Sequence, residues 1–137
     1  DVQFRAGVGR RVEVIMTPEA TIYKFFSGFS IPAYAATSVP DNAEFPYITY
    51  ELAVDDFWGG EVALSMDIWY RGDSEAEPNA KAREVSKALI GCKCIPCDGG
   101  GVILKKGSPF CQSMGDAADG KIKRRHINVI AEFITSF

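Results

Sequence analysis

The clearest pattern in the chain is a pair of β-rich segments, residues 45–54 and 61–71, in which apolar and polar positions alternate. Alternation with period two places the apolar side chains of a strand on one face. A connection containing Gly59 and Gly60 joins the segments, and a glycine turn between such segments favours a β-hairpin. We therefore expect two antiparallel strands with one apolar face that packs on other elements. The expected inward residues are Ile48, Tyr50, Leu52, Val54, Val62, Leu64, Met66, Ile68 and Tyr70.

Helical periodicity appears once before the hairpin and once after it. Thr17 suits an N-cap and Pro18 the first helical position, which predicts a helix over about Pro18–Ser27 that stops at Gly28. A second helix is predicted over about Pro78–Ile90, ended by Gly91. Each helix has an apolar stripe at helical spacing. The stripes are Ile22, Phe25, Phe26 and Phe29 in the first helix, and Ala82, Val85, Ala88 and Leu89 in the second.

The C-terminal third returns to strand patterns. Val102–Lys105 predicts a third strand, with Phe110–Met114 as a candidate continuation beyond residues 107–109. Residues 121–137 predict a long final strand with alternating apolar positions in its second half. The expected fold class is therefore α+β: an antiparallel sheet of four or slightly more strands with both helices on one face, in the order α-β-β-α-β-β.

Residues 1–15 stand apart from this pattern. The chain begins at Asp1, and Met16 immediately precedes the strong helix start. One interpretation makes residues 1–15 an N-terminal extension outside a natural reading frame that starts at Met16. The other makes residues 12–16 a natural short strand, because apolar and polar residues alternate there. We expect residues 16–137 to form a single α+β domain.

Composition narrows the function classes. A chain of 137 residues with 47% hydrophobic content is expected to be one domain with a real core. With 15 basic and 18 acidic residues, the net charge of −3 gives no reason to expect nucleic-acid binding. The longest apolar runs are too short for a membrane span and no signal peptide is visible, so reduced thiols in a cytosolic context are expected.

The cysteines form the one chemically suggestive cluster: Cys92, Cys94, Cys97 and Cys111. A zinc site needs four converging ligands, usually from two cysteine pairs, whereas here Cys111 stands alone. A redox C-x-x-C pair normally opens a helix, whereas Cys94–Cys97 follows one and precedes a glycine run. We expect thiols with packing roles. A metal site on these four residues, or a redox or disulfide pair, is the alternative.

Two segments are candidates for contacts between subunits. Phe57 and Trp58 lie in the hairpin turn, where they either fold back over the sheet or bind another subunit. The basic stretch, residues 121–125, is expected to meet acidic groups of a neighbouring subunit, for which the acidic loop 73–77 is suitable, or water. A phosphate group is the alternative partner. The basic residues are Lys121, Lys123, Arg124 and Arg125.

No catalytic residue or cofactor is expected. The glycine run after Asp98 lacks the Gly-Lys-Ser/Thr ending of a phosphate loop. The acidic residues are not tied to another catalytic group, and His126 is expected to be packed or at the surface.

Several short motifs occur in a characteristic order along the chain: Ile22–Phe26, Ile31–Tyr34, Val39–Asp41, Phe45–Tyr50, Ile68–Arg71 and Ile122–Phe133. The ordered set resembles small tail-completion proteins of tailed bacteriophages and prophages, most closely those of phages of Firmicute bacteria. The resemblance covers roughly residues 16–135. The broader group includes the tail-terminator proteins of long-tailed phages.

The resemblance implies an α+β subunit of a hexameric ring that caps the finished tail tube and offers a surface to the head connector. It implies assembly in the bacterial host cytoplasm and a final location in the virion, without catalysis, nucleic-acid sequence recognition or membrane contact. The alternatives are another head–tail or tail-tube subunit, or, in a different class, a small zinc-binding or thiol protein that uses Cys92, Cys94, Cys97 and Cys111.

Overall fold

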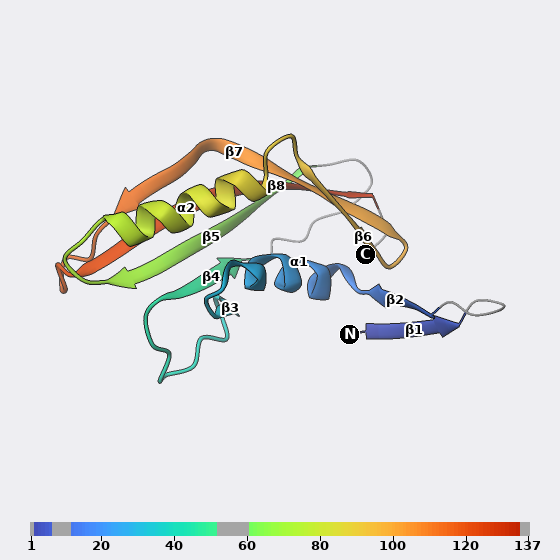
Figure 1. The fold of residues 1–137 in the computed structure, drawn as a ribbon, viewed down its shortest axis with the longest axis horizontal. Helices are drawn as coiled ribbons and strands as arrows, with labels where there is room; N and C mark the ends of the chain where they lie inside the picture. The colour runs from blue at the N-terminus through green and yellow to red at the C-terminus, as the bar shows by residue number, and fades with distance from the viewer. Residues whose placement is uncertain (1, 7–11, 52–60, 135–137) are drawn as a thin grey trace.

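A curled six-stranded sheet organises the chain (Figure 1). The structure, a computed structural model, describes residues 2–6, 12–51 and 61–134. The strand order is β3-β4-β5-β8-β7-β6, and every neighbouring pair is antiparallel except β3 and β4. The strands of this sheet are β3 (Ala33–Ala35), β4 (Tyr47–Glu51), β5 (Glu61–Arg71), β6 (Lys93–Cys97), β7 (Gly100–Met114) and β8 (Ile122–Ile134).

The predicted hairpin is the β4–β5 pair. Its register sets Ile48 opposite Ile68 and Tyr50 opposite Met66. The alternation is confirmed, because Ile48, Leu64, Met66 and Ile68 are all buried. Leu52 and Val54 lie outside the described residues.

The first helix is confirmed with a different ending. α1 (Pro18–Phe26) begins where Thr17 Oγ1 accepts a hydrogen bond from the amide of Ala20 at 3.2 Å. The predicted stop at Gly28 is wrong, because the chain tightens into a 3-10 turn, η1 (Ser27–Phe29). The left-handed residue that ends this turn is Ser30, with φ of 67°.

The second helix is confirmed with shifted bounds. α2 (Ala76–Ala88) begins two residues before the predicted Pro78. Ser74 Oγ accepts from the amide of Ala76 at 3.0 Å, so the loop serine and not Asn79 supplies the hydrogen bond at this end. Gly91 and Cys92 both have positive φ, 69° and 65°, and carry the chain away from the helix.

The sheet is larger than four strands and is mixed. β3 is too short to show an alternation, and it pairs with β4 in parallel. β6 contains Pro96, which a strand tolerates at the border of a sheet because the missing N–H faces away from the neighbour. The expected antiparallel order α-β-β-α-β-β is therefore corrected by two added strands, one at each border of the sheet.

β7 continues as a single strand through residues 107–109, where the strand pattern of the sequence is interrupted. Its register against β8 shifts between Lys106 and Cys111, and the Ser108–Pro109 peptide bond in this interval is cis, like Phe45–Pro46. Gly107 lies against β8, where an added Cβ would stand 2.8 Å from Cβ of Asn128. The glycine therefore marks a close approach between strands and not the end of a strand.

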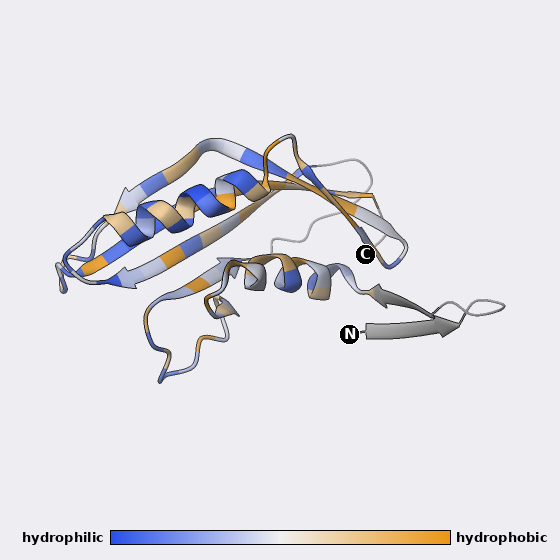
Figure 2. Cartoon of the chain, viewed as in Figure 1, coloured by the Kyte–Doolittle hydropathy of each residue, from blue (hydrophilic) through white to orange (hydrophobic). Residues whose placement is uncertain are grey.

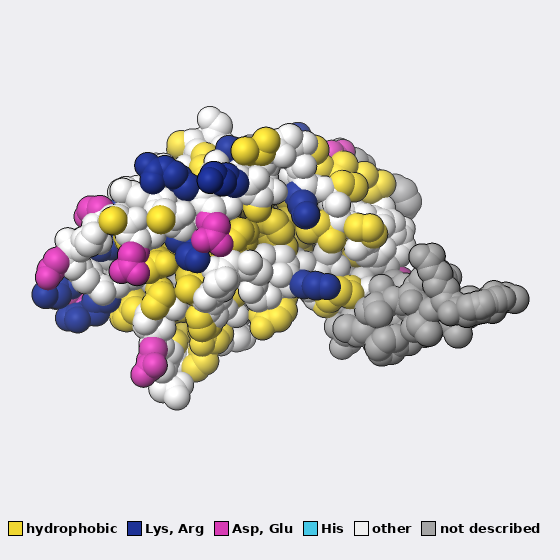
Figure 3. All heavy atoms as spheres, in the orientation of Figure 1, with side chains coloured by type: hydrophobic (Ala, Val, Ile, Leu, Met, Phe, Trp, Pro, Cys, Tyr) yellow, Lys and Arg dark blue, Asp and Glu magenta, His cyan; other side chains and the backbone are white. Residues whose placement is uncertain are grey.

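The two helices share one core on one side of the sheet. Ile22 and Phe26 of α1 and Val85 of α2 belong to a single buried cluster with the inward residues of β5, β7 and β8. Apolar and polar stripes alternate along β5 in Figure 2. On the helix side, apolar side chains gather between α1 and α2 (Figure 3). Neither of the described helices is long and apolar enough to cross a membrane.

The N-terminal segment forms its own sheet. β1 (Val2–Ala6) and β2 (Val12–Met16) pair antiparallel, separately from the larger sheet. The carbonyl of Met16 accepts from the amide of Asp98 at 2.6 Å, which ties the end of β2 to the turn after β6. Residues 12–16 are thus a strand, whereas the use of Met16 as a natural start stays a prediction.

Candidate functional site

The predicted basic stretch finds its partners within the same chain. Lys121 Nζ lies 3.2 Å from an oxygen of Asp73, and Lys123 Nζ donates to the carbonyl of Gly120 at 2.8 Å. Arg124 Nε donates to Asp67 at 2.9 Å, and Arg125 Nη2 donates to Glu75 at 2.5 Å. The acidic loop expected to match the basic stretch across a subunit boundary therefore matches it internally. The role of these residues at an interface stays a prediction.

Arg125 differs from its neighbours because it points into the molecule. It lies opposite Ile68 on the inward side of β8 and is only 3% exposed. Besides Glu75, it donates from Nε and Nη2 to Oδ1 of Asn79 at 3.2 and 3.0 Å. The hydrogen bond from Arg125 holds the pKa of the Glu75 carboxyl below its ordinary value. This cluster fastens the first turn of α2 to β8.

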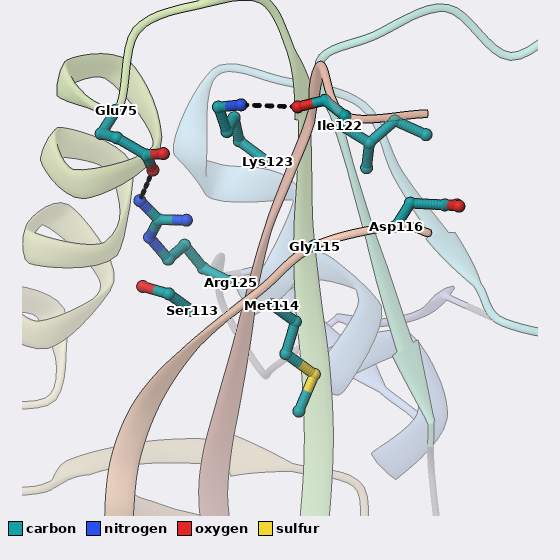
Figure 4. Close-up of a pocket in the computed structure, with 9 residues that line it drawn as sticks. Glu75, Ser113, Met114, Gly115, Asp116, Ile122, Lys123 and Arg125 are labelled. Atoms are coloured by element: carbon teal, nitrogen blue, oxygen red, sulfur yellow. Dashed lines mark hydrogen bonds and ion pairs between the residues drawn. The ribbon is translucent and has the colours of Figure 1, made fainter. Parts of the chain in front are cut away.

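A pocket of about 260 Å³ lies beside this cluster, where the chain passes from β7 to β8 (Figure 4). Three of its charged side chains are engaged with one another or with a carbonyl, since Arg125 holds Glu75 and Lys123 binds the carbonyl of Gly120. The fourth, Asp116, accepts from the amide of Ala118 at 2.8 Å. The pocket therefore offers Ser113, Met114 and backbone groups more than a free charge. Its lining residues are Glu75, Ser113, Met114, Gly115, Asp116, Gly120, Ile122, Lys123 and Arg125.

The cysteines do not converge. Cys94 and Cys97 are three residues apart on one strand, so their side chains point to opposite faces of the sheet. Cys97 is buried, and burial with the nearby Asp98 carboxylate raises the pKa of its thiol. Cys92, Cys94 and Cys111 are exposed as residues, although partial burial of the Cys111 sulfur raises the pKa of its thiol. Within the described ranges, no three His, Cys, Asp or Glu side chains lie close enough together to hold a metal ion.

A ladder of large side chains crosses the face of the sheet that is turned away from the core. The rings of Tyr34 and Tyr47 are 6.0 Å apart, and those of Tyr47 and Trp69 are stacked at 6.2 Å. Cζ of Arg124 lies 4.9 Å from the centre of the Trp69 ring, and Met114 on β7 stands opposite Arg124. We call this set, together with Phe45 against Tyr47, the outer ladder. It runs over β3, β4, β5, β8 and β7.

Polar contacts fix the outer ladder in place. Trp69 Nε1 donates to Thr49 Oγ1 at 2.9 Å, which sets the indole plane. The oxygen Oδ1 of Asp67 lies 2.9 Å from both Arg124 Nε and His126 Nδ1. Because Asp67 holds Arg124, the guanidinium keeps its position over the indole.

Sequence analysis did not identify this ladder. The alternation does place Tyr47 and Trp69 on the polar side of the predicted hairpin, and aromatic residues at such positions were the available signal. Joining them to Tyr34, Arg124 and Met114 requires the strand order, because these residues come from distant parts of the chain.

The other predicted contact residues, Phe57 and Trp58, lie outside the described residues. In comparisons with known proteins, no family model, no curated protein and no solved structure matches the chain.

Proposed function

We propose that the chain is a structural subunit of the tail of a long-tailed bacteriophage or prophage, similar to a tail terminator. In this proposal six copies form a ring that caps the tail tube and meets the head connector. The subunit is made in the cytoplasm of the bacterial host and ends in the virion. It works through protein–protein contacts and needs no catalytic residue or cofactor.

The observation that carries the proposal is which sequence motifs supply the residues of the outer ladder. Four of the six motifs by which the chain resembles tail-completion proteins supply members of the ladder: Tyr34 from residues 31–34, Phe45 and Tyr47 from 45–50, Trp69 from 68–71 and Arg124 from 122–133. Aromatic residues, arginine and methionine are enriched where proteins bind one another. The resemblance motifs therefore combine into a surface suited to a protein partner.

The alternatives have less support. A zinc or thiol protein needs sulfur ligands that converge, and the opposite directions of Cys94 and Cys97 work against a shared metal. A tail-tube-like subunit remains the nearer rival, because it would also use a surface of this kind. The two differ in behaviour, since a tube protein polymerises whereas a terminator closes into one ring.

The test is the assembly state of purified protein, alone and with the tail-tube protein of the same phage, measured by native mass spectrometry and electron microscopy. We expect a closed ring of six subunits that ends tube growth. Phe45→Ala, at a residue that is 37% exposed, should weaken the ring while thermal unfolding stays unchanged. Tyr23→Ala, at an exposed aromatic of α1, is the matched control and should leave the ring intact.

Two results would contradict the proposal. Protein that stays monomeric with the tube protein present is not a terminator, and protein that polymerises into tubes is the rival subunit.

A further inference from the structure

The second half of β7 is an open border of the sheet. β6 pairs with β7 only from Gly100 to Leu104, and β8 occupies the opposite side. No strand in the described part of the chain lies along the other side of β7 beyond Leu104. Figure 1 shows this half of β7 running along the margin of the sheet. Alternate backbone N–H and C=O groups of such a border point outward and can pair with another strand.

Within this border, residues 110–114 have the geometry for pairing. After the register shift at Lys106–Cys111, β7 pairs regularly with β8 from Cys111 to Met114. Cys111, Gln112, Ser113 and Met114 are all exposed. We call Phe110–Met114 the free edge of β7.

One common protection of edge strands, a charged residue within the strand, is missing from the free edge. Edge strands of soluble proteins commonly carry charged residues, which oppose pairing with a second chain. Here no charged residue occurs from Gly107 to Gly115. Pro109 and the register shift discourage pairing along the earlier part of the border, and Lys106 Nζ lies 5.3 Å from the centre of the Phe110 ring. Cys111–Met114 is therefore the part of the free edge without such a feature.

We propose that the free edge of β7 pairs antiparallel with the same edge of a second copy of this chain, about a two-fold axis at Gln112. Charge favours this occupant and this direction. Each copy carries a net charge of −3, and the uncharged free edge lets two copies meet without like charges in direct contact. Lys106 precedes the free edge and Asp116 follows it, so antiparallel pairing brings the basic end of one copy toward the acidic end of the other. Parallel pairing would bring like charges together.

This contact goes beyond the proposed ring. A two-fold contact is isologous and joins copies in pairs, whereas a closing ring uses a heterologous contact. The two proposals therefore concern different surfaces. The paired edge is tested on purified protein without a tail tube, so either proposal can fail while the other stands.

The test uses charge exchange at the axis. Gln112→Glu and Gln112→Lys each place like charges opposite one another in a two-fold pair, and each should weaken self-association by about tenfold or more. An equimolar mixture of the two variants should restore association, because opposite charges then meet at the axis. Sedimentation equilibrium measures association, and thermal unfolding checks that each variant is folded. Asn42→Glu and Asn42→Lys, at an exposed residue of the turn before β4, are the matched controls.

Each other outcome overturns the proposal. Wild-type protein that is monomeric up to its solubility limit has no such contact. Variants that associate like the wild type place the contact elsewhere. Variants that are weakened but not restored on mixing show that Gln112 faces a different residue, which excludes the two-fold pair.

Discussion

Arg125 carries a charge into the inward side of β8. Sequence patterns group it with the other basic residues of 121–125, but strand alternation turns it toward α2. A buried guanidinium is tolerated only when its donors are satisfied, and Glu75 and Asn79 provide the acceptors. Arg125 is therefore a residue of the fold, and Lys123 is the better choice for probing an interface by charge reversal.

The Glu75–Arg125 pair predicts an acid-dependent loss of stability. Because the pKa of Glu75 is lowered in the folded protein, folding favours the ionised carboxylate. This contribution is complete above the ordinary glutamate pKa of 4.5 and is lost as the pH falls through the lower folded value. Arg125→Met should therefore show a shallower dependence of the free energy of unfolding on pH below about 4.5. Urea unfolding at a series of pH values measures it, with Lys87→Met as the control; equal slopes would contradict the pairing.

Leu64→Ala tests how much the packing of the core contributes to the free energy of unfolding. The Leu64 side chain is 1% exposed, so Leu64→Ala should lower the free energy of unfolding by about 3 kcal/mol. Ile90→Ala, at a side chain that is 69% exposed, should change it by less than about 0.5 kcal/mol. Denaturant unfolding of both variants gives the comparison. A small effect at Leu64 would place that face of β5 at the surface.

At the scale of elements, the close approach of β7 to β8 depends on the absence of a side chain at Gly107. Gly107→Ala would bring a Cβ within 3.0 Å of the carbonyl oxygen of Asn128, and backbone cannot move aside as a flexible side chain can. We expect a loss of about 1–3 kcal/mol in the free energy of unfolding. Gly115→Ala is the matched control, because nothing lies within 4 Å of its added Cβ. Equal stability of the two variants would show that β7 does not approach β8 so closely.

The β1–β2 hairpin is an element with few ties to the main sheet. Its strands pair with each other, and the bond from Asp98 to Met16 is at its end. Deleting residues 1–15 should therefore leave the fold of residues 16–137 intact, with a melting temperature lower by only a few degrees. Circular dichroism with thermal melting checks this. Loss of cooperative unfolding in the shortened protein would instead make the hairpin part of the domain.

At the scale of the whole molecule, the turn residue Trp58 tests whether the hairpin tip contributes to assembly. A large apolar side chain is costly to leave in water, so Trp58→Ala should weaken ring formation while the isolated subunit keeps its melting temperature. Native mass spectrometry and thermal melting separate the two effects. An unfolded Trp58→Ala protein would place the residue in the core, and normal rings would assign the contact to another surface.

The sequence by itself determined the elements with strong periodicity. Both helices, the β4–β5 hairpin and the long strand β8 follow from apolar residues repeated at helical or strand spacing, because one buried face selects those positions. Short or interrupted elements could not be predicted in this way, because they show too few periodic positions. β3 has three residues, and the glycine that marks a close approach in β7 has the appearance of a break.

Only the tertiary structure decided which residues meet. Strand order assembled Tyr34, Tyr47, Trp69, Arg124 and Met114 into the outer ladder, and among the described strands it left the free edge of β7 without a neighbour on its open side. It also paired the basic and acidic segments within the same chain. Asp73 and Glu75, in the loop before α2, bind Lys121 and Arg125. Periodicity tells which side of its own element a residue occupies, whereas its neighbours depend on how distant segments pair.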